Sequence, residues 1–268
     1  MRSRMVFAAS VIAGLSSSMA AQAAVLLQDN FTAIYTNDPA TYDINQNLAV
    51  RQAGSSLGTV NWEKMGPGNA TQVGNGGNYL LLANTGRAVL RHNFNGTAAA
   101  GGMTIAFDVK PHTDASNTTK WTAISLGMSE GDRGTYVNGA PAHFGILFRA
   151  NGGWQTFDGE VVKGEGTDLS LKLNTFTPVK IVITDPTDNN PFNGLGQTDI
   201  AVFINNSSTP ALTYSKAGGY ADNYINFHAA DDIGAIDNLV ISSPIPEPTS
   251  LAAIAALGGL LMRRRRPA

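Results

Sequence analysis

The stretch that decides the fold is 104–110, TIAFDVK, in which Ile105, Phe107 and Val109 alternate with small or polar residues. A period of two is that of a β-strand with one buried and one exposed face. The same alternation recurs in 124–128 (ISLGM), 144–149 (FGILFR), 179–183 (VKIVI) and 200–204 (IAVFI). The chain therefore contains several strands that each bury one face.

Segments rich in turn-forming residues separate these strands. They are 114–119 (DASNTT), 151–153 (NGG), 185–194 (DPTDNNPFNG) and 205–209 (NNSST). Asn, Asp, Gly, Pro and Ser favour turns because their side chains or backbones suit turn dihedral angles. Between the two ends of the chain no segment has a three-to-four-residue period of helical length. We predict an all-β fold of roughly a dozen strands, an antiparallel jelly-roll sandwich.

Residues 1–23 have the features of a secretory signal peptide. Two arginines lie among the first four residues, 5–15 form an apolar stretch that predicts a signal helix, and Ala21-Gln22-Ala23 matches an A-x-A cleavage site. We expect export through the Sec translocon and removal of this segment by signal peptidase. The mature chain would then begin at residue 24.

The part between the two ends, residues 24–243, is predicted to be one domain. Its length suits a single core, and 43% of the chain is apolar while only 14% is charged. There is no cysteine, so a disulfide framework, a thiol nucleophile and zinc–thiolate sites are excluded. Hydrophobic burial, with or without a bound ion, must stabilise this exported domain.

The charge of the domain argues against a nucleic-acid partner. Six of the 18 basic residues lie in the first 23 or last 25 residues, together with one of the 20 acidic residues. The domain therefore keeps 12 basic and 19 acidic residues, a net charge of −7. A nucleic-acid-binding surface needs a basic face, whereas this charge leaves carboxylates available for a divalent cation.

The chain ends in a segment of three parts, residues 244–268. Pro246-Glu247-Pro248 precedes an uncharged apolar run, 251–262. Four arginines follow that run: Arg263, Arg264, Arg265 and Arg266. A helix of the run would span about 18 Å, against about 30 Å for the hydrocarbon core of a bilayer. We expect a short transmembrane helix that holds the protein temporarily, with the arginines keeping the C-terminus in the cytoplasm; the alternative is a permanent anchor.

This order of parts resembles the PEP-CTERM sorting signal. The resemblance implies that an exosortase, a membrane-embedded cysteine transpeptidase, removes the tail. It also implies that the mature protein reaches the cell surface or the exopolysaccharide matrix of a Gram-negative bacterium.

The domain itself has a second resemblance. The phrases LLQDNF (26–31), FGILFRANGGWQTFDG (144–159) and AIDNLVI (235–241) are similar to those of the laminin-G-like, concanavalin A-like jelly rolls that precede such tails. The resemblance implies two curved antiparallel sheets with the first and last strands adjacent. It leaves the function open, because this fold carries lectins, glycanases and adhesion modules.

No catalytic motif is complete. Residues 54–58, GSSLG, match G-x-S-x-G, but a strand-like segment follows where a nucleophile elbow needs a helix. The four histidines are scattered singly, so no zinc-enzyme spacing is present. A glycanase needs two facing carboxyl groups. The nearest pairs, Glu130 with Asp132 and Asp158 with Glu160, lie in glycine-containing segments that we interpret as solvated turns.

Tryptophan offers the best candidate for a carbohydrate contact. Exposed aromatic faces stack on sugar rings, while neighbouring polar side chains hydrogen-bond the hydroxyl groups. Because Trp154 follows a glycine turn, we take Trp154, Arg149 and Asn151 as candidate ligand-binding residues. The alternative for Trp154 is a place in the core. Trp121 is assigned to the core because an apolar strand follows it.

Two oxygen-rich sets of residues are candidate calcium ligands. The first is Asp185, Asp188 and Asn190, whose spacing does not match an EF-hand loop and whose alternative is an Asx-rich turn. The second is Asp29 and Asp237, which approach each other if the closing strand lies beside the opening one. Two facing acids need a cation or N–H donors. Ca²⁺ is the only candidate cofactor.

The sequence thus predicts an exported, non-catalytic protein of the cell surface or matrix, one that binds extracellular polysaccharide or is structural. The alternative is a secreted glycoside hydrolase or lyase on the same fold.

Overall fold

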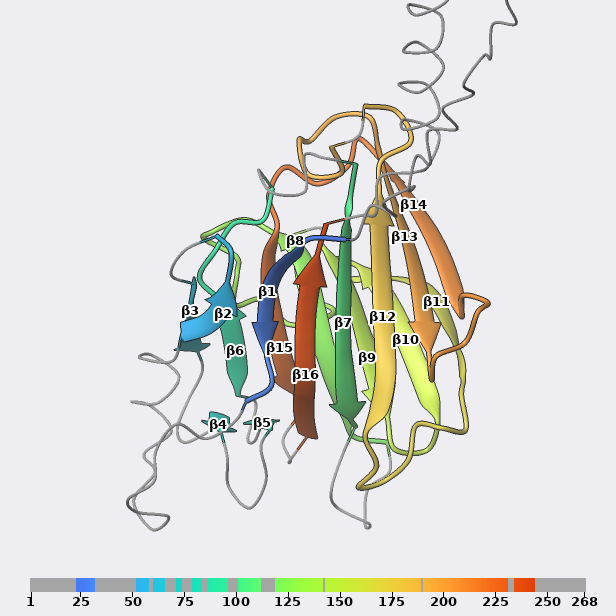
Figure 1. Ribbon diagram of the computed structural model, residues 1–268. Coiled ribbons are helices and arrows are strands. Elements are labelled where there is room, and N and C mark those ends of the chain that lie inside the picture. The colour runs from blue at the N-terminus through green and yellow to red at the C-terminus, as the bar shows by residue number, and fades with distance from the viewer. Residues whose placement is uncertain are drawn as a thin grey trace, which may run out of the picture. The chain divides into compact units, whose positions relative to one another are not determined.

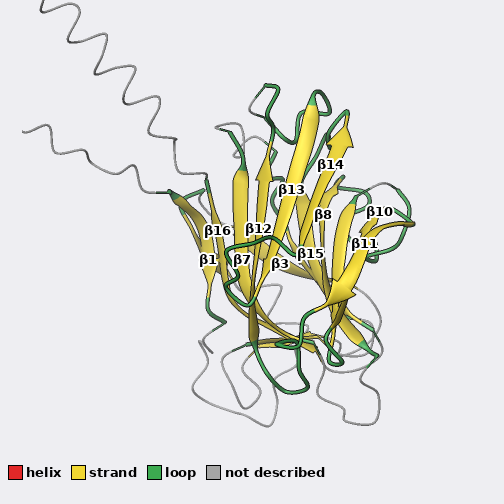
Figure 2. Ribbon diagram, turned by 90° about the vertical axis from the view of Figure 1, so that its right-hand side faces the viewer, coloured by secondary structure: helices red, strands yellow, loops and turns green. Residues whose placement is uncertain are grey.

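All regular structure in the described part of the chain is β-strand (Figure 2). The computed structural model describes residues 23–31, 52–57, 60–65, 71–73, 79–82, 86–95, 101–111, 119–141, 143–188, 190–230 and 234–243. Every strand pairing among them is antiparallel. The predicted all-β, antiparallel jelly-roll sandwich is confirmed. The strands are β1 (Val25–Asp29), β2 (Gln52–Ser55), β3 (Val60–Met65), β4 (Thr71–Val73), β5 (Leu80–Leu82), β6 (Arg87–Leu90), β7 (Met103–Lys110), β8 (Trp121–Met128), β9 (Phe144–Arg149), β10 (Gly153–Asp158), β11 (Val161–Thr167), β12 (Thr177–Thr184), β13 (Gln197–Ile204), β14 (Leu212–Ala217), β15 (Tyr224–Ala229) and β16 (Gly234–Ser242).

The strands form two layers that pack face to face (Figure 1). One layer, called here the β7 layer, has the order β1-β16-β7-β12-β13-β14, with β5 also paired to β16. The other, the β8 layer, has the order β11-β10-β9-β8-β15-β6-β3. Strand β2 pairs with both β1 and β3 and so connects the layers at one side. Each layer therefore has one face toward the core and one outer face.

The alternation of 104–110 explains how the main core forms. Ile105, Phe107 and Val109 are all buried in it. The Phe107 ring crosses to the β8 layer, with ring centroids 6.3 Å from Phe148 and 5.4 Å from Phe227. Burying the apolar face of the strands in this way is the main driving force for packing the layers. All five strands that the sequence predicted are present.

Strand β9 departs from simple alternation because its outer face is also covered. Leu147 is buried in a second, small cluster with Ala123, Val137 and Phe157. Residues 129–141, which connect β8 toward β9, lie across this outer face and contribute Val137. Leu147 can therefore be apolar on the outer face of β9, because residues 129–141 cover it.

The first and last strands are adjacent, as the resemblance to laminin-G-like jelly rolls implied. β1 pairs with β16, and the backbone N–H of Ser243 donates to the carbonyl of Ala24 at 2.9 Å. Residues 23–244 form one compact unit. No part of the chain that the structure describes forms a helix long and apolar enough to cross a membrane. The segments predicted to form the two terminal helices, Ala21 and the sorting residues 246–248 and 263–266 lie outside the described residues.

Candidate functional site

An aromatic and a basic side chain lie side by side on the outer face of the β8 layer. Trp121 of β8 pairs directly with Arg149 of β9. Ile124 and Leu126 of β8 point into the main core, so Trp121, an odd number of residues away from both, points outward. Its indole ring is partly exposed and packs against the second cluster. The core position predicted for Trp121 is therefore met only in part, because the ring packs against the second cluster and not in the main core.

Arg149 begins a row of polar side chains that crosses three strands. Its Nη2 donates to Oε1 of Gln155 at 2.7 Å, and Nε2 of Gln155 donates to Oε2 of Glu165 at 2.7 Å. We call Arg149, Gln155 and Glu165 the polar row. The bond to Gln155 is the one hydrogen bond of the Arg149 side chain in the described part of the chain, although its guanidinium has five N–H donors. The other donors have no hydrogen-bond partner among the described residues.

The charge of Arg149 is incompletely compensated within the domain. Burial lowers the pKa of its guanidinium, and the attraction of the Glu165 carboxylate opposes that shift. Glu165 is exposed and touches Gln155 rather than Arg149. Among the described residues no carboxylate contacts this half-buried cation directly, which favours a ligand that brings acceptor oxygens to it.

Residues 129–141 form a ledge beside the polar row. The side-chain amide of Asn226 donates to the carbonyl of Thr135 at 3.1 Å. A Cβ atom added to Gly145 would lie 2.4 Å from the carbonyl oxygen of Val137, so the ledge rests directly on the β9 backbone. The ledge buries one part of the outer face, while the polar row stays partly exposed at its side.

The ring of a buried histidine, His228, packs against the ring of Trp121. His228 is fully buried, its ring lies 5.4 Å from that of Trp121 at 89°, and its Nε2 lies 3.2 Å from Oγ of Ser125. Desolvation, with smaller contributions from His143 and Arg87, lowers the pKa of His228 to about 3, so the ring is neutral at physiological pH. Because Ser125 and His228 are both 0% exposed, this contact cannot act on an external substrate. Its chemistry is structural.

Trp154 corrects the choice of aromatic residue made from the sequence. It pairs with Phe148 of the core across β9 and β10, and is only 7% exposed. Gly166 of β11 lies opposite it, and a Cβ atom added there would be 2.5 Å from the indole ring. No face of Trp154 is open to a sugar, so it is a core residue, which was the alternative.

Asn151 lies in the exposed turn between β9 and β10. Its Oδ1 accepts a hydrogen bond from the backbone N–H of Gly153 at 3.0 Å, and Gly152 between them has a φ of 91°. The oxygen of Asn151 therefore stabilises the turn. Of the three predicted ligand-binding residues, the structure places Arg149 on the outer face, Asn151 in the neighbouring turn and Trp154 in the core.

The calcium candidates after β12 use most of their oxygens within their own turn. Oδ1 of Asp185 accepts from the backbone N–H groups of Thr187 at 2.6 Å and Asp188 at 3.2 Å. Asp188 accepts from the backbone of Asn190 at 3.0 Å and from the side chain of Asn193 at 2.6 Å. Burial works to raise the pKa of Asp185, but hydrogen bonds from Thr187 and Asp188 lower it overall. This is the Asx-rich turn of the alternative.

Asp29 and Asp237 both have partners within the domain. Asp29 is buried and accepts hydrogen bonds from Nε1 of Trp62 at 2.9 Å and from the backbone N–H of Phe31 at 2.8 Å. Asp237 pairs with Asp108 of β7. Burial, Asp108 and Asp29 raise the pKa of Asp237. Among the residues that the structure describes, no group of three or more acidic or histidine side chains is placed to hold a metal ion.

The two serines of the G-x-S-x-G match make hydrogen bonds within the fold. Ser55 and Ser56 lie at the end of β2 and in the turn after it, with β3 beyond, and their hydroxyls donate to the carbonyls of Leu26 and Val25. A strand follows, as expected from the sequence, so the segment lacks the strand-to-helix geometry of a nucleophile elbow.

One of the four acids in the two pairs was misinterpreted. Glu160 lies in the exposed turn after β10, as predicted. Glu130 and Asp132 lie in a turn, as predicted. Asp158 does not: it ends β10 and its carboxylate accepts from Oη of Tyr214 at 2.8 Å and from Nζ of Lys216 at 3.1 Å. It joins the two layers at their β10 and β14 side and is committed to a structural ion pair.

Comparison with known proteins gives likenesses of fold only. No protein-family model and no curated protein matches the chain. Among solved structures, the receptor-binding domain of botulinum neurotoxin mosaic serotype C/D is 13% identical, with a TM-score of 0.49, over 87% of this chain and 50% of that one. The chain thus spans about half the length of that domain.

Two further solved structures cover the jelly roll more fully. The exoplasmic/lumenal domain of VIP36, in a form bound to Ca²⁺ and Man3GlcNAc, is 8% identical with a TM-score of 0.47, over 69% of this chain and 84% of that one. The carbohydrate recognition domain of Emp46p is 10% identical with a TM-score of 0.48, over 78% of this chain and 98% of that one. At these identities and TM-scores we draw nothing from them about a ligand.

Proposed function

We propose that this protein is a non-catalytic, exported protein that binds polysaccharide on the outer face of its β8 layer. The observation that carries the proposal is the partly exposed Trp121 beside Arg149, whose guanidinium makes one hydrogen bond within the described residues. An aromatic ring gives a sugar a surface for its C–H groups. The polar row gives donors and acceptors for its hydroxyl groups.

The arrangement favours a polysaccharide over a small apolar ligand or a nucleic acid. Gln155 and Glu165 present amide and carboxylate groups held in place by their mutual hydrogen bond, so little side-chain entropy is lost when a ligand binds. The domain is acidic overall, with 12 basic against 19 acidic residues, which disfavours a polyanion such as nucleic acid.

The test is affinity electrophoresis of residues 23–244 in gels that contain dextran, laminarin or alginate, followed by calorimetry with the polysaccharide that retards the protein. Trp121→Ala and Arg149→Gln should each weaken binding at least tenfold, about 1.4 kcal/mol. Arg149→Lys should not restore it, because an ammonium cannot reproduce the planar fork of a guanidinium.

Lys172→Ala is the matched control, since it removes an exposed cation from the loop between β11 and β12, outside the polar row. It should bind as the unaltered domain does. If Trp121→Ala and Arg149→Gln fold normally and are retarded as strongly as the control, this face is not the binding site.

The same proposal includes how the protein is delivered. Residues 1–23, with Ala21 and Ala23 at the cleavage site, support export through the Sec translocon and signal peptidase. Pro246-Glu247-Pro248, the short apolar run and Arg263 to Arg266 support sorting by an exosortase. The mature protein would then lie at the cell surface or in the matrix, where polysaccharide is the abundant ligand.

Calcium is part of the proposal only at Asp185. Its Oδ2 is buried and has no hydrogen-bond partner among the described residues, and a carboxylate oxygen is a ligand that Ca²⁺ prefers. Calcium at a hundred times its dissociation constant would add about 2.7 kcal/mol of stability. Melting curves with EDTA and with added calcium test this; coincident curves would remove calcium from the proposal.

One observation keeps the enzyme alternative open for testing. Asp108 and Asp237 face each other across β7 and β16, and the pKa of Asp237 is raised by burial and by Asp108. A glycoside hydrolase needs such a pair, with one carboxyl kept protonated. A reducing-sugar assay on the same three polysaccharides decides it: release of ends that Asp237→Asn abolishes would establish hydrolysis.

A further inference from the structure

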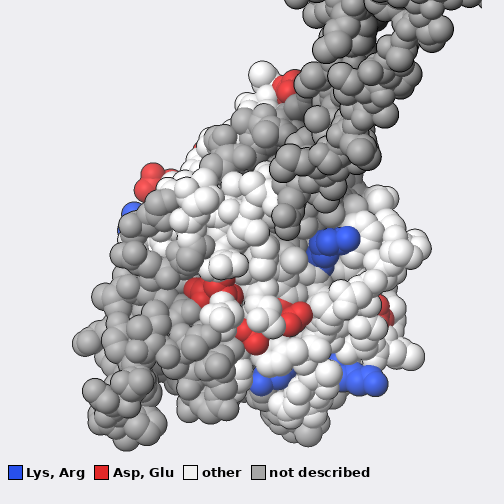
Figure 3. Space-filling model, in the orientation of Figure 1, with Lys and Arg blue, Asp and Glu red and all other residues white. Residues whose placement is uncertain are grey.

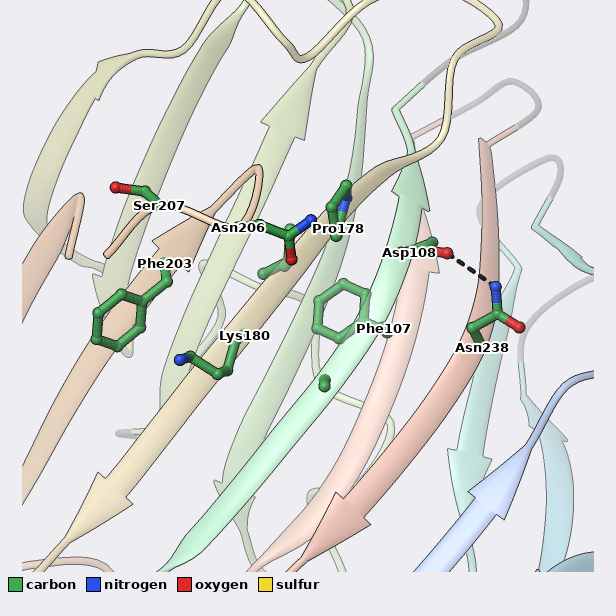
Figure 4. Close-up of a pocket in the computed structure, with 10 residues that line it drawn as sticks. Phe107, Asp108, Pro178, Lys180, Phe203, Asn206, Ser207 and Asn238 are labelled. Carbon is green, nitrogen blue, oxygen red and sulfur yellow. Dashed lines mark hydrogen bonds between the residues drawn. The ribbon is translucent and has the colours of Figure 1, made fainter. Parts of the chain in front are cut away.

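The outer face of the β7 layer, which is opposite to the polar row, carries a hollow of about 240 Å³ (Figure 4). Its polar and aromatic lining comes from β7, β12, β13, the turn after β13 and β16. The lining residues that matter here are Asp108, Lys180, Phe203, Asn206, Ser207 and Asn238. Figure 3 shows this outer face, on which acidic side chains gather and basic side chains stand apart from them.

An aromatic ring forms one side of the hollow. Val202 and Ile204 of β13 are buried in the main core, so Phe203 between them points outward and is partly exposed. Nζ of Lys180 lies 4.3 Å from the centroid of the ring. At an exposed site this cation–π contact is weak, so a ligand can displace the flexible ammonium and stack on the ring.

Hydrogen-bonding groups form the other side. Asn238 donates through Nδ2 to Oδ2 of Asp108 at 2.8 Å (Figure 4), which fixes both side chains and leaves the Asn238 amide oxygen directed elsewhere. Asn206 is exposed, and its side chain has no hydrogen-bond partner in the described part of the chain. Asn206 and Asn238 both have left-handed backbones, with φ of 55° and 49°, a conformation that asparagine tolerates better than most residues.

We propose that this hollow is a second carbohydrate-binding site and that the domain bridges two polysaccharide chains. Its volume is below the roughly 300–1,000 Å³ of pockets for drug-sized ligands, so it suits one sugar unit of a chain. Phe203 offers the stacking surface, Asp108 an acceptor, and the Asn206 amide both a donor and an acceptor. The bridging part rests on the proposed function of the polar row.

The geometry of the sandwich makes the two sites independent. The main core lies between them, and the two outer faces point away from each other (Figure 1). Because the two faces are on opposite sides of the core, occupation of the two sites by different polysaccharide chains joins those chains. Bridging strengthens attachment, because after one site is bound the next binding event takes place at a high effective concentration of polysaccharide.

The test uses beads coated with the polysaccharide that retards the domain, and it measures bead aggregation by light scattering. Phe203→Ala and Asn206→Gly should still bind to the beads but need at least ten times more protein to aggregate them. Glycine is chosen at position 206 because it adopts the positive φ without strain. Ser215→Ala, an exposed change on β14 of the same layer, is the control and should aggregate beads normally.

Gel filtration accompanies the assay, because a dimer would bridge chains with only one site per copy. Bridging is overturned if the monomeric unaltered domain binds beads without aggregating them, or if both hollow variants aggregate them at the unaltered concentration. Trp121→Ala should also abolish aggregation while leaving residual binding through the hollow.

A second measurement separates the hollow from the proposed function. In ¹⁵N NMR titrations with methyl glycosides of glucose and mannose, the amides of residues 206, 207 and 238 should shift in both the unaltered domain and Trp121→Ala. Shifts confined to residues near Arg149 would support the proposed function and overturn the hollow. Shifts confined to the hollow would do the reverse.

Discussion

Replacing Trp154 by alanine tests which face of the β9–β10 hairpin is buried. The indole is 7% exposed, packs in the main core and lies against Gly166 of the neighbouring strand. Removing a buried aromatic side chain costs about 3–5 kcal/mol, from lost transfer free energy and from the cavity left behind. Because a domain typically has about 5–15 kcal/mol of stability, Trp154→Ala should remove a large share of it.

The expected change in melting temperature follows from domain size. For domains of about 150–250 residues, 1 kcal/mol shifts the midpoint by about 2–4 °C, so Trp154→Ala should lower it by roughly 6–20 °C. Urea unfolding followed by far-UV circular dichroism gives the free energy directly. Trp121→Ala, at a partly exposed ring, should cost clearly less. A loss below about 1 kcal/mol for Trp154→Ala would refute the inward orientation of the indole.

Gly166→Ala provides an independent check of the same contact. The glycine has no positive φ that would exclude alanine, and the three atoms nearest to an added Cβ all belong to the indole, the closest at 2.5 Å. Overpacking of this kind costs about 1–3 kcal/mol. In the Trp154→Ala background the opposing ring is absent, so Gly166→Ala should become neutral or slightly stabilising. A double-mutant cycle measures this coupling, and additive effects would contradict the contact.

Two further predictions concern charge and processing. Asp237→Asn should stabilise the domain at pH 7, because burial and Asp108 raise the pKa of Asp237 and so make its ionised form unfavourable in the folded state. The gain should disappear in urea titrations below about pH 3.9, where the carboxyl is protonated in both states; equal stabilities at pH 7 would contradict it. Intact mass of the protein from the native cell surface should correspond to cleavage near Pro246 to Pro248, and changing those three residues to alanine should leave an uncleaved, membrane-held precursor. A mature mass that includes Ala268 would exclude the sorting signal.

The fold could be predicted well because a strand with one buried face has apolar residues at every second position of its sequence. In 104–110 and in 200–204 every inward residue is apolar, so the strands and their buried faces could be identified directly. Strand β11 was not predicted, because it lacks this alternation of buried apolar residues. It lies at an edge and is mostly exposed, and its sequence VVKGEGT has no buried face to reveal it.

The site was harder to predict because it depends on which side of a strand each residue occupies. Trp121 could have been assigned correctly: three residues before the inward-facing Ile124, period two places it outward. Trp154 could not, because its side follows from pairing with Phe148, and that register depends on the turn at 150–152. The hollow joins four segments distant in sequence, including the end of β13 with the turn around Asn206, and no local pattern indicates it.

One register therefore sets both the core and the candidate site. Pairing Phe148 with Trp154 places both rings inward and, by alternation, Arg149 and Gln155 outward. A shift of one residue would exchange the faces, exposing the indole and burying the guanidinium without a partner. Both consequences are unfavourable, so the energy that buries Trp154 also holds Arg149 at the surface. Trp154, which the sequence suggested as the sugar contact, instead packs in the core and thereby keeps Arg149 on the outer face.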